Sequence, residues 1–223
     1  GTGCDTILSQ MAADCLDCDL DRIAVRGVDT DFSPYDTGSY ASSTTYVTGM
    51  AVVKTCQVLR EKILKTGASM LNVPEETAEF DGKRVFVPGT EKQVTLEEIS
   101  YEGHNRCLSA SESHSSPISP PPFMVGMAEI DLDPETGKVE VVDYVGAVDC
   151  GTVINTNLAR VQTEGGIVQG IGMALYEDIC YSASGKMENN SFLQYKIPSR
   201  LDVGKIRIEF ESSYEPTGPF GAK

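Results

Sequence analysis

The sequence predicts an α+β fold of two subdomains, each combining helices with a mixed sheet. Two long segments repeat apolar residues at helical spacing, and several shorter ones alternate or run apolar as strands do. A Ser- and Pro-rich stretch without apolar periodicity, residues 109–122, separates the two halves and is expected to be an exposed connection. The prediction therefore places a first subdomain at residues 1–108 and a second, expected to be C-terminally truncated, at residues 123–223.

The first subdomain is expected to be mainly helical, with one hairpin. Helical spacing and capping patterns predict three helices, over residues 6–17, from Ser43 onward, and from the capping-box order of Thr95 and Glu98 onward. Apolar alternation and the turn dipeptide Asp81-Gly82 predict a strand and a hairpin, over residues 22–28 and 79–87.

The second subdomain is expected to begin with a hairpin of residues 123–131 and 138–148. Acidic residues in its turn are spaced like the ligands of a Ca²⁺ loop, but the glycine falls one place late and the twelfth position is Val142 instead of a bidentate Glu. A solvated turn is therefore predicted. A helix over residues 157–176 and a strand over residues 205–210 complete this half.

Glycines are the unusual feature of the predicted helix over residues 157–176. It contains four of them, at Gly165, Gly166, Gly170 and Gly172. Each interior glycine costs ~1 kcal/mol relative to alanine, so four together disfavour the helix by several kcal/mol. Either another backbone or a bulky ligand is expected to approach closely here.

Composition excludes several classes of function. Because 33 Asp and Glu oppose 18 Lys and Arg, the net charge of −15 argues against nucleic-acid and membrane partners. Seven cysteines are an odd number and suggest reduced thiols, and the single C-x-x-C, Cys15 to Cys18, lacks the further ligands of a zinc site. No apolar run approaches the ~20 residues of a membrane span, so a cytoplasmic protein is expected. No phosphate loop, dinucleotide fingerprint or serine-hydrolase elbow occurs.

Four segments carry more information than composition does. They are Gly1-Thr2-Gly3-Cys4-Asp5-Thr6, residues 36–45, residues 149–172 and Pro216-Thr217-Gly218-Pro219-Phe220-Gly221-Ala222-Lys223. In this order they resemble the molybdenum-cofactor-binding subunit of the xanthine dehydrogenase and aldehyde oxidoreductase family, the molybdenum hydroxylases. The chain is similar to the C-terminal part of that large subunit, which implies a molybdenum-cofactor-binding domain fold.

The resemblance implies a molybdopterin site. Backbone N–H groups of glycine loops and hydroxyls at a helix N-terminus suit a pyranopterin and its phosphate, because they provide donors with little bulk. The residues expected to bind the cofactor are Gly1, Thr2, Gly3, Thr6, Ala41, Ser42, Ser43, Thr44, Thr45, Gln162, Glu164, Gly165 and Gly166. From the residues alone, an ordinary helix cap at the hydroxyl run and close helix packing at the glycines stay open. Thr2 and Ser43 stand where many relatives have Gln and Arg, so the cofactor tail, phosphate or cytosine dinucleotide, also stays open.

The resemblance further implies an oxidoreductase. The family oxidises N-heterocycles or aldehydes with water-derived oxygen, using a glutamate base and passing electrons to 2Fe-2S clusters and usually FAD on other domains or subunits. That glutamate follows the Gly-Ala-Lys segment, beyond Lys223, so no catalytic residue and no metal ligand is expected here, and the fragment alone is expected to be inactive. The expected partners are the N-terminal half of the cofactor subunit and the iron–sulfur and flavin subunits. A paralogue acting reductively on an aromatic thioester and a non-catalytic binding or scaffold module remain as alternatives.

Overall fold

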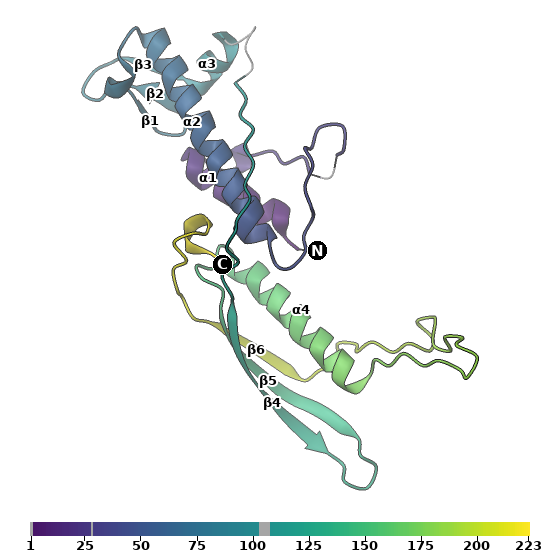
Figure 1. Ribbon diagram of the computed structural model, residues 1–223. Coiled ribbons are helices and arrows are strands. Elements are labelled where there is room, and N and C mark those ends of the chain that lie inside the picture. The colour runs from purple at the N-terminus through teal and green to yellow at the C-terminus, as the bar shows by residue number, and fades with distance from the viewer. Residues whose placement is uncertain (1, 28, 103–107) are drawn as a thin grey trace. The chain divides into compact units, whose positions relative to one another are not determined.

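The computed structural model describes residues 2–27, 29–102 and 108–223 and divides into two compact units (Figure 1). Unit 1 comprises residues 1–119 and 216–223, and unit 2 comprises residues 120–215. The sequence assigned residues 216–223 to the second subdomain, whereas here they group with unit 1, for reasons given below. Both units mix helices with a small sheet, which confirms the α+β prediction. None of the described helices is long and apolar enough to cross a membrane.

Unit 1 is built from helices and one small sheet. The helical elements are α1 (Cys4–Leu16), η1 (Leu20–Arg22), the π-helical turn η2 (Thr44–Thr48), α2 (Gly49–Leu71), η3 (Glu75–Thr77), α3 (Leu96–Glu102) and η5 (Pro219–Gly221). The strands β1 (Glu79–Phe80), β2 (Arg84–Phe86) and β3 (Gln93–Thr95) form an antiparallel sheet in that order.

The two long helices of unit 1, α1 and α2, run in the same direction. A side chain at Gly49, the first residue of α2, would lie 2.8 Å from the Met11 sulfur, and the Arg60 guanidinium donates to the Cys15 carbonyl at 3.3 Å. The residue farther along α1, Cys15, contacts the residue farther along α2, Arg60. The N-terminal ends of α1 and α2 therefore lie at the same end of unit 1 (Figure 1).

The core of unit 1 lies between the second half of α2, α3 and the sheet. Its buried residues are Ile63, Ala68, Ala78, Phe80, Val85, Val94 and Ile99. Gly67 lets α2 approach β2, because a Cβ at this position would lie 2.5 Å from the Cβ of the fully buried Val85. The backbone of α2 at Gly67 therefore lies directly against the Val85 side chain of β2.

Local sequence signals of unit 1 mostly hold. The hairpin turns at Gly82, whose φ is +81°, and the capping box is formed, with the Thr95 amide 2.7 Å from a Glu98 carboxylate oxygen and the Glu98 amide 3.2 Å from the Thr95 hydroxyl. The strand predicted over residues 22–28 is wrong for the described part, residues 22–27, which forms no strand. A strand needs a hydrogen-bonded neighbour, and among the described residues β1, β2 and β3 pair with one another and with no further strand.

The Ser/Pro-rich stretch is held along α2. Its part within unit 1, residues 109–119, contains no helix or strand. The Lys62 ammonium donates to the Ser109 carbonyl at 2.7 Å, and the Lys54 ammonium lies 2.9 Å from Nδ1 of His114. These contacts fix a segment that has no regular structure of its own.

Residues 216–223 pack at the junction of η2 and α2. The Tyr46 hydroxyl lies 2.7 Å from the Thr217 hydroxyl, and a Cβ at Gly49 would lie 3.0 Å from the Pro219 ring. Ala222 is only 1% exposed. These contacts are the physical reason why the end of the chain belongs to unit 1, and sequence separation gave no sign of them.

Unit 2 is a three-stranded sheet with one helix on it. Its elements are β4 (Phe123–Leu132), β5 (Val139–Asp149), α4 (Thr156–Leu175) and β6 (Lys205–Phe210). Strand β5 pairs antiparallel with β4 and parallel with β6, and α4 lies on the connection from β5 to β6. The predicted hairpin, helix and strand are confirmed. In the hairpin, Asp133 accepts hydrogen bonds from the Glu135 amide at 2.9 Å and the Thr136 hydroxyl at 2.6 Å, so an exposed, hydrogen-bonded turn lies where a turn was predicted.

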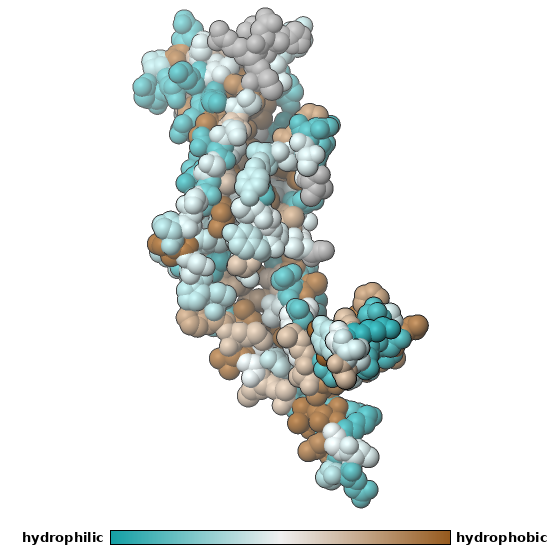
Figure 2. Space-filling view, turned by 45° about the vertical axis from the view of Figure 1, so that its right-hand side comes forward, coloured by the Kyte–Doolittle hydropathy of each residue, from teal (hydrophilic) through white to brown (hydrophobic). Residues whose placement is uncertain are grey.

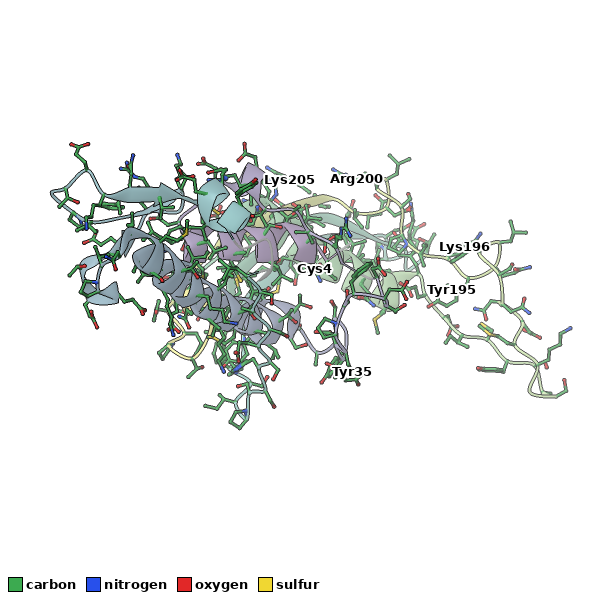
Figure 3. All side chains as sticks on the ribbon, turned by 90° about the horizontal axis from the view of Figure 1, so that it is seen from above. Cys4, Tyr35, Tyr195, Lys196, Arg200 and Lys205 are labelled. Atoms are coloured by element: carbon green, nitrogen blue, oxygen red, sulfur yellow. The ribbon has the colours of Figure 1, made fainter. Side chains whose placement is uncertain are left out.

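Helix α4 begins at a side-chain cap and packs on the sheet. The Leu158 amide donates to the Asn155 side chain at 3.0 Å. Buried Ile167 and Ile171 pack on Val141 of β5 and on Val203. After α4 the chain forms an exposed arm, residues 177–201, which carries Tyr195 and Lys196 (Figure 3).

We predict that Gly67→Ala destabilises the protein by about 1–3 kcal/mol. The added methyl group collides with Val85, whose β-branched side chain has little freedom to move, and this outweighs the ~1 kcal/mol gain in helix propensity. The free energy of unfolding in urea measures the effect. In the control Gly170→Ala of α4, nothing lies within 4 Å of the added atom, so the same measurement should give equal or higher stability. Equal effects of both changes would contradict the packing described here.

We also predict that acidification below about pH 6.5, the ordinary pKa of histidine, weakens the attachment of the Ser/Pro stretch. Partial burial, and then the Lys54 ammonium, lower the pKa of His114 in the folded protein. The unfolded chain therefore binds this proton first, and the free energy of unfolding falls as pH drops below the ordinary value. His114→Gln should remove this part of the pH dependence. Identical pH profiles of both proteins would show that His114 contributes nothing.

Candidate cofactor-binding site

Three of the four segments with family resemblance meet in unit 1. The first forms the start of α1, the second leads into η2, and the last packs on the η2–α2 junction through Thr217 and Pro219. Helix α1 contacts both η2 and α2. The third segment, residues 149–172, lies in unit 2.

The start of α1 is a glycine turn with exposed threonines. Gly3 precedes the helix with a φ of 70°, a left-handed conformation that favours glycine, and no side chain caps the first turn. Thr2 and Thr6 are exposed, and Cys4 marks the helix start in Figure 3. Gly1 lies outside the described residues. Within the described residues, no side-chain cap binds the N–H groups of the first helical turn, and these groups carry the positive end of the helix dipole.

The loop before η2 has an unusual backbone. Ala41 and Ser42 have φ values of 48° and 60°, and two consecutive left-handed residues other than glycine are uncommon. The Ser43 amide and hydroxyl both donate to the Tyr40 carbonyl, at 3.0 Å and 2.8 Å. The loop thus turns tightly just before the helical residues begin.

The four hydroxyls of this loop differ in availability. Ser43 donates to Tyr40, and Thr44 donates to the Ser39 hydroxyl at 2.8 Å. Among the residues that the structure describes, the hydroxyls of Ser42 and Thr45 form no hydrogen bond. No side chain caps the first turn of η2, so the ordinary helix cap that the sequence left open is not formed. Ser42 and Thr45 are the donors left for a ligand.

Helix α4 presents one exposed face without bulk. We call it the glycine face, and its residues are Gln162, Gly165, Gly166, Gln169 and Gly170, all of them exposed. Their spacing of three and four residues places them on one side of the helix. An added Cβ at any of the three glycines would meet nothing within 4 Å.

The fourth glycine of α4 has a different role. A Cβ at Gly172 would lie 2.3 Å from a Glu177 carboxylate oxygen and 2.9 Å from the Pro198 ring. Close packing therefore explains Gly172, which faces the start and end of the arm. It does not explain the glycine face, where nothing within the described chain approaches.

Glu164 lies away from the glycine face. It is two residues from both Gln162 and Gly166, which in a helix means roughly 200° of rotation. It is half-buried and pairs with Arg160 at 3.5 Å. Of the expected site residues in α4, the structure therefore brings together Gln162, Gly165 and Gly166 but not Glu164.

Two of the cysteines, Cys15 of α1 and Cys56 of α2, form a contact between these helices. A hydrogen bond between the two thiols raises the pKa of Cys15 and lowers that of Cys56, and burial raises the pKa of Cys15 further. In residues 2–27, 29–102 and 108–223, no group of three or more His, Cys, Asp or Glu side chains is arranged to hold a metal ion.

Two groups of residues were missed by sequence reasoning. Gln169 and Gly170 extend the glycine face by one turn. Gly170 stood out as a helix glycine, but neither residue was among the expected cofactor-binding residues, although the helical spacing from Gln162 and Gly166 indicates both. The Tyr46 and Thr217 hydroxyl pair ties the end of the chain to η2, and the Ser116 hydroxyl donates to Tyr46 at 3.5 Å. These residues are far apart in sequence, so no local pattern indicated them.

Known proteins resemble this chain in sequence and in fold. The family model of a molybdopterin cofactor-binding domain matches residues 1–204. The probable hypoxanthine oxidase XdhD of Escherichia coli strain K12 is 32% identical over all of this chain, which spans 24% of that relative. The reconstituted CO dehydrogenase from Oligotropha carboxidovorans has a TM-score of 0.84 at 28% identity, and the chain covers 29% of it. Quinoline 2-oxidoreductase from Pseudomonas putida 86 has a TM-score of 0.80 at 27% identity, with 30% of that chain covered.

The match of the family model over most of the chain is decisive, and the fold, the order of the four segments and the solved structures agree with it. The chain spans about a quarter to a third of the length of these relatives. It belongs to the molybdopterin cofactor-binding domain family.

Proposed function

We propose that this chain is the part of a molybdenum hydroxylase large subunit that holds the organic portion of the molybdenum cofactor. The intact enzyme, in this proposal, oxidises an N-heterocycle or an aldehyde with oxygen derived from water. The observation that carries the proposal is the glycine face of α4, where three glycines leave space that the described chain does not fill.

The glycine face suits a flat, polar ring system. Missing side chains let a ring lie against the helix backbone, and the amides of Gln162 and Gln169 provide donors and acceptors beside it. The helix sacrifices about 3 kcal/mol for its three exposed glycines, relative to alanine. Contacts with a tightly bound ligand are a sufficient reason for this cost.

The start of α1 and the loop before η2 suit an anionic group. The N-terminal N–H groups of α1 and the hydroxyls of Ser42 and Thr45 are donors, and the helix dipole favours negative charge at this end. In a chain with a net charge of −15, such local donors are needed to hold a phosphate. We assign the phosphate of the cofactor tail to these residues, and Thr2 and Thr6 to its surroundings.

The residues of this chain bind and orient, and the cofactor supplies the redox and oxygen-transfer chemistry when it is bound. Ser42 and Thr45 hold the tail, and Gln162 fixes the edge of the ring system. We place the glutamate base after Lys223, outside this sequence, and the 2Fe-2S clusters and FAD on other domains or subunits. The N-terminal half of the large subunit completes the site, and the complex works in the cytoplasm.

The relatives favour an N-heterocyclic substrate over an aldehyde. One relative is named for hypoxanthine and another for quinoline, and both compounds are N-heterocycles. Other relatives are named as carbon monoxide dehydrogenases, so the domain serves more than one substrate class. The cofactor tail, phosphate or cytosine dinucleotide, is read directly by nucleotide analysis of the extracted cofactor.

We predict that Gln162→Ala and Ser42→Ala each lower the molybdenum and pterin content of the purified complex. Losing a hydrogen bond to an anionic or strongly polar ligand costs about 1.5–3 kcal/mol, which corresponds to about ten- to hundredfold in affinity. Elemental analysis measures the metal, and fluorescence of the oxidised pterin measures the organic part.

Matched controls remove similar groups elsewhere. Asn157→Ala removes an exposed amide from α4 outside the glycine face, and Ser100→Ala removes an exposed hydroxyl from α3. Both should keep full cofactor content. If the two site variants also keep it, the site assignment is wrong, and a complex without any cofactor favours the scaffold alternative.

A further inference from the structure

The two edges of the unit 2 sheet are built differently. At the β6 edge, Lys205, Arg207 and Glu209 are exposed and alternate with half-buried apolar residues. Alternating charges at an edge discourage pairing with further strands. At the other edge, all residues of β4 are exposed, and no strand of the described part of the chain pairs with its free side.

The first six residues of strand β4, residues 123–128, are apolar on both faces, whereas Glu129 and Asp131 lie farther along the face away from α4. The Met124 methyl group lies on the α4 side, because a Cβ at Gly146 would contact both Met124 and Ile167. Val125 and Met127 point to the opposite side, since successive residues of a strand alternate. They are 72% and 68% exposed. Strands that are apolar on both faces are typical of the interior of a sheet covered on both sides.

Helix α4 does not cover β4. A helix is about 10 Å wide and strands lie about 4.8 Å apart, so one helix covers about two strands. Here α4 packs on Val141 of β5 and on Ile206 and Ile208 of β6. Further along β4, Ile130 remains 54% exposed. Figure 2 shows an apolar patch near the tip of the β4–β5 hairpin, at the lower end of the view.

We propose that β4 is an interior strand of the intact large subunit, with its free edge paired to an extended apolar segment of the same polypeptide outside residues 1–223. This inference rests on the proposed function only in taking the chain as part of a large subunit. The relatives supply the required length, because the chain spans 24–31% of the first five of them.

A second copy of the chain is the less favourable occupant of this edge. Two copies, each with a net charge of −15, repel one another, whereas a segment of the same polypeptide is held nearby at high effective concentration. The segment would bond the unpaired backbone groups of β4 and cover Val125 and Met127 with its own apolar side chains.

Amide hydrogen exchange of the intact subunit, read at single-residue resolution, tests the pairing. In an edge strand only alternate N–H groups are bonded, so the others exchange fast, whereas an interior strand is protected throughout. We expect every β4 amide from Met124 to Asp131 to be protected. In β6, protected and fast-exchanging amides should alternate, which gives the reference pattern of an edge strand. Rapid exchange of alternate β4 amides would overturn the proposal.

A photo-crosslinker at Met127 identifies the occupant. Met127→p-benzoylphenylalanine in the intact subunit should crosslink within one polypeptide to a segment outside residues 1–223, whereas the matched Glu209→p-benzoylphenylalanine on β6 should not crosslink. Crosslinks between two copies, or to residues 1–223, would contradict the proposal. Both readouts are independent of molybdenum content, so they stand even if the cofactor assignment fails.

Discussion

The sequence of α4 reflects a constraint that packing within unit 2 does not supply, because three of its glycines face open space. Inside unit 2, the helix is held by Ile167 and Ile171 on the sheet, and this packing needs no glycine on the opposite side. By contrast, packing within unit 2 explains Gly172, because Glu177 and Pro198 occupy the space that a side chain at this position would need. The glycine face lacks such a neighbour, so its cost in helix stability points to an external ligand.

Unit 1 also provides a surface that suits a ligand, because its fold brings together segments that are distant in the sequence. The parallel course of α1 and α2 places two helix starts at one end, and Pro219 packs against Gly49 where α2 begins. In the tight loop at Ala41 and Ser42, two hydroxyls donate hydrogen bonds within the loop, and two others have no hydrogen-bond partner among the described residues. Donors without side-chain bulk are thereby concentrated where the segments resembling the family meet, which is a suitable environment for a phosphate.

Local patterns predicted most elements because local forces determine them. Helical spacing, the Thr95–Glu98 capping box and the Gly82 turn are satisfied by neighbouring residues, and each is confirmed. The strand expected over residues 22–28 is not formed in its described part, residues 22–27, because strand formation depends on a partner, which spacing does not reveal. For the same reason the sequence could not indicate that residues 216–223 join unit 1. At the site, the resemblance supplied the candidate residues, and only the structure separated Glu164 from the glycine face and Ser42 and Thr45 from Ser43 and Thr44.

The most direct test of the central claim is Gly166→Leu in the intact complex. Leucine is a better helix former than glycine by somewhat less than 1 kcal/mol, and nothing in the described chain lies within 4 Å of the added Cβ. If the glycine face is kept open for the cofactor, the cofactor-free protein should be as stable as the parent or more stable, while molybdenum and pterin content should fall to a small fraction. Full cofactor content in a stable Gly166→Leu protein would contradict the account.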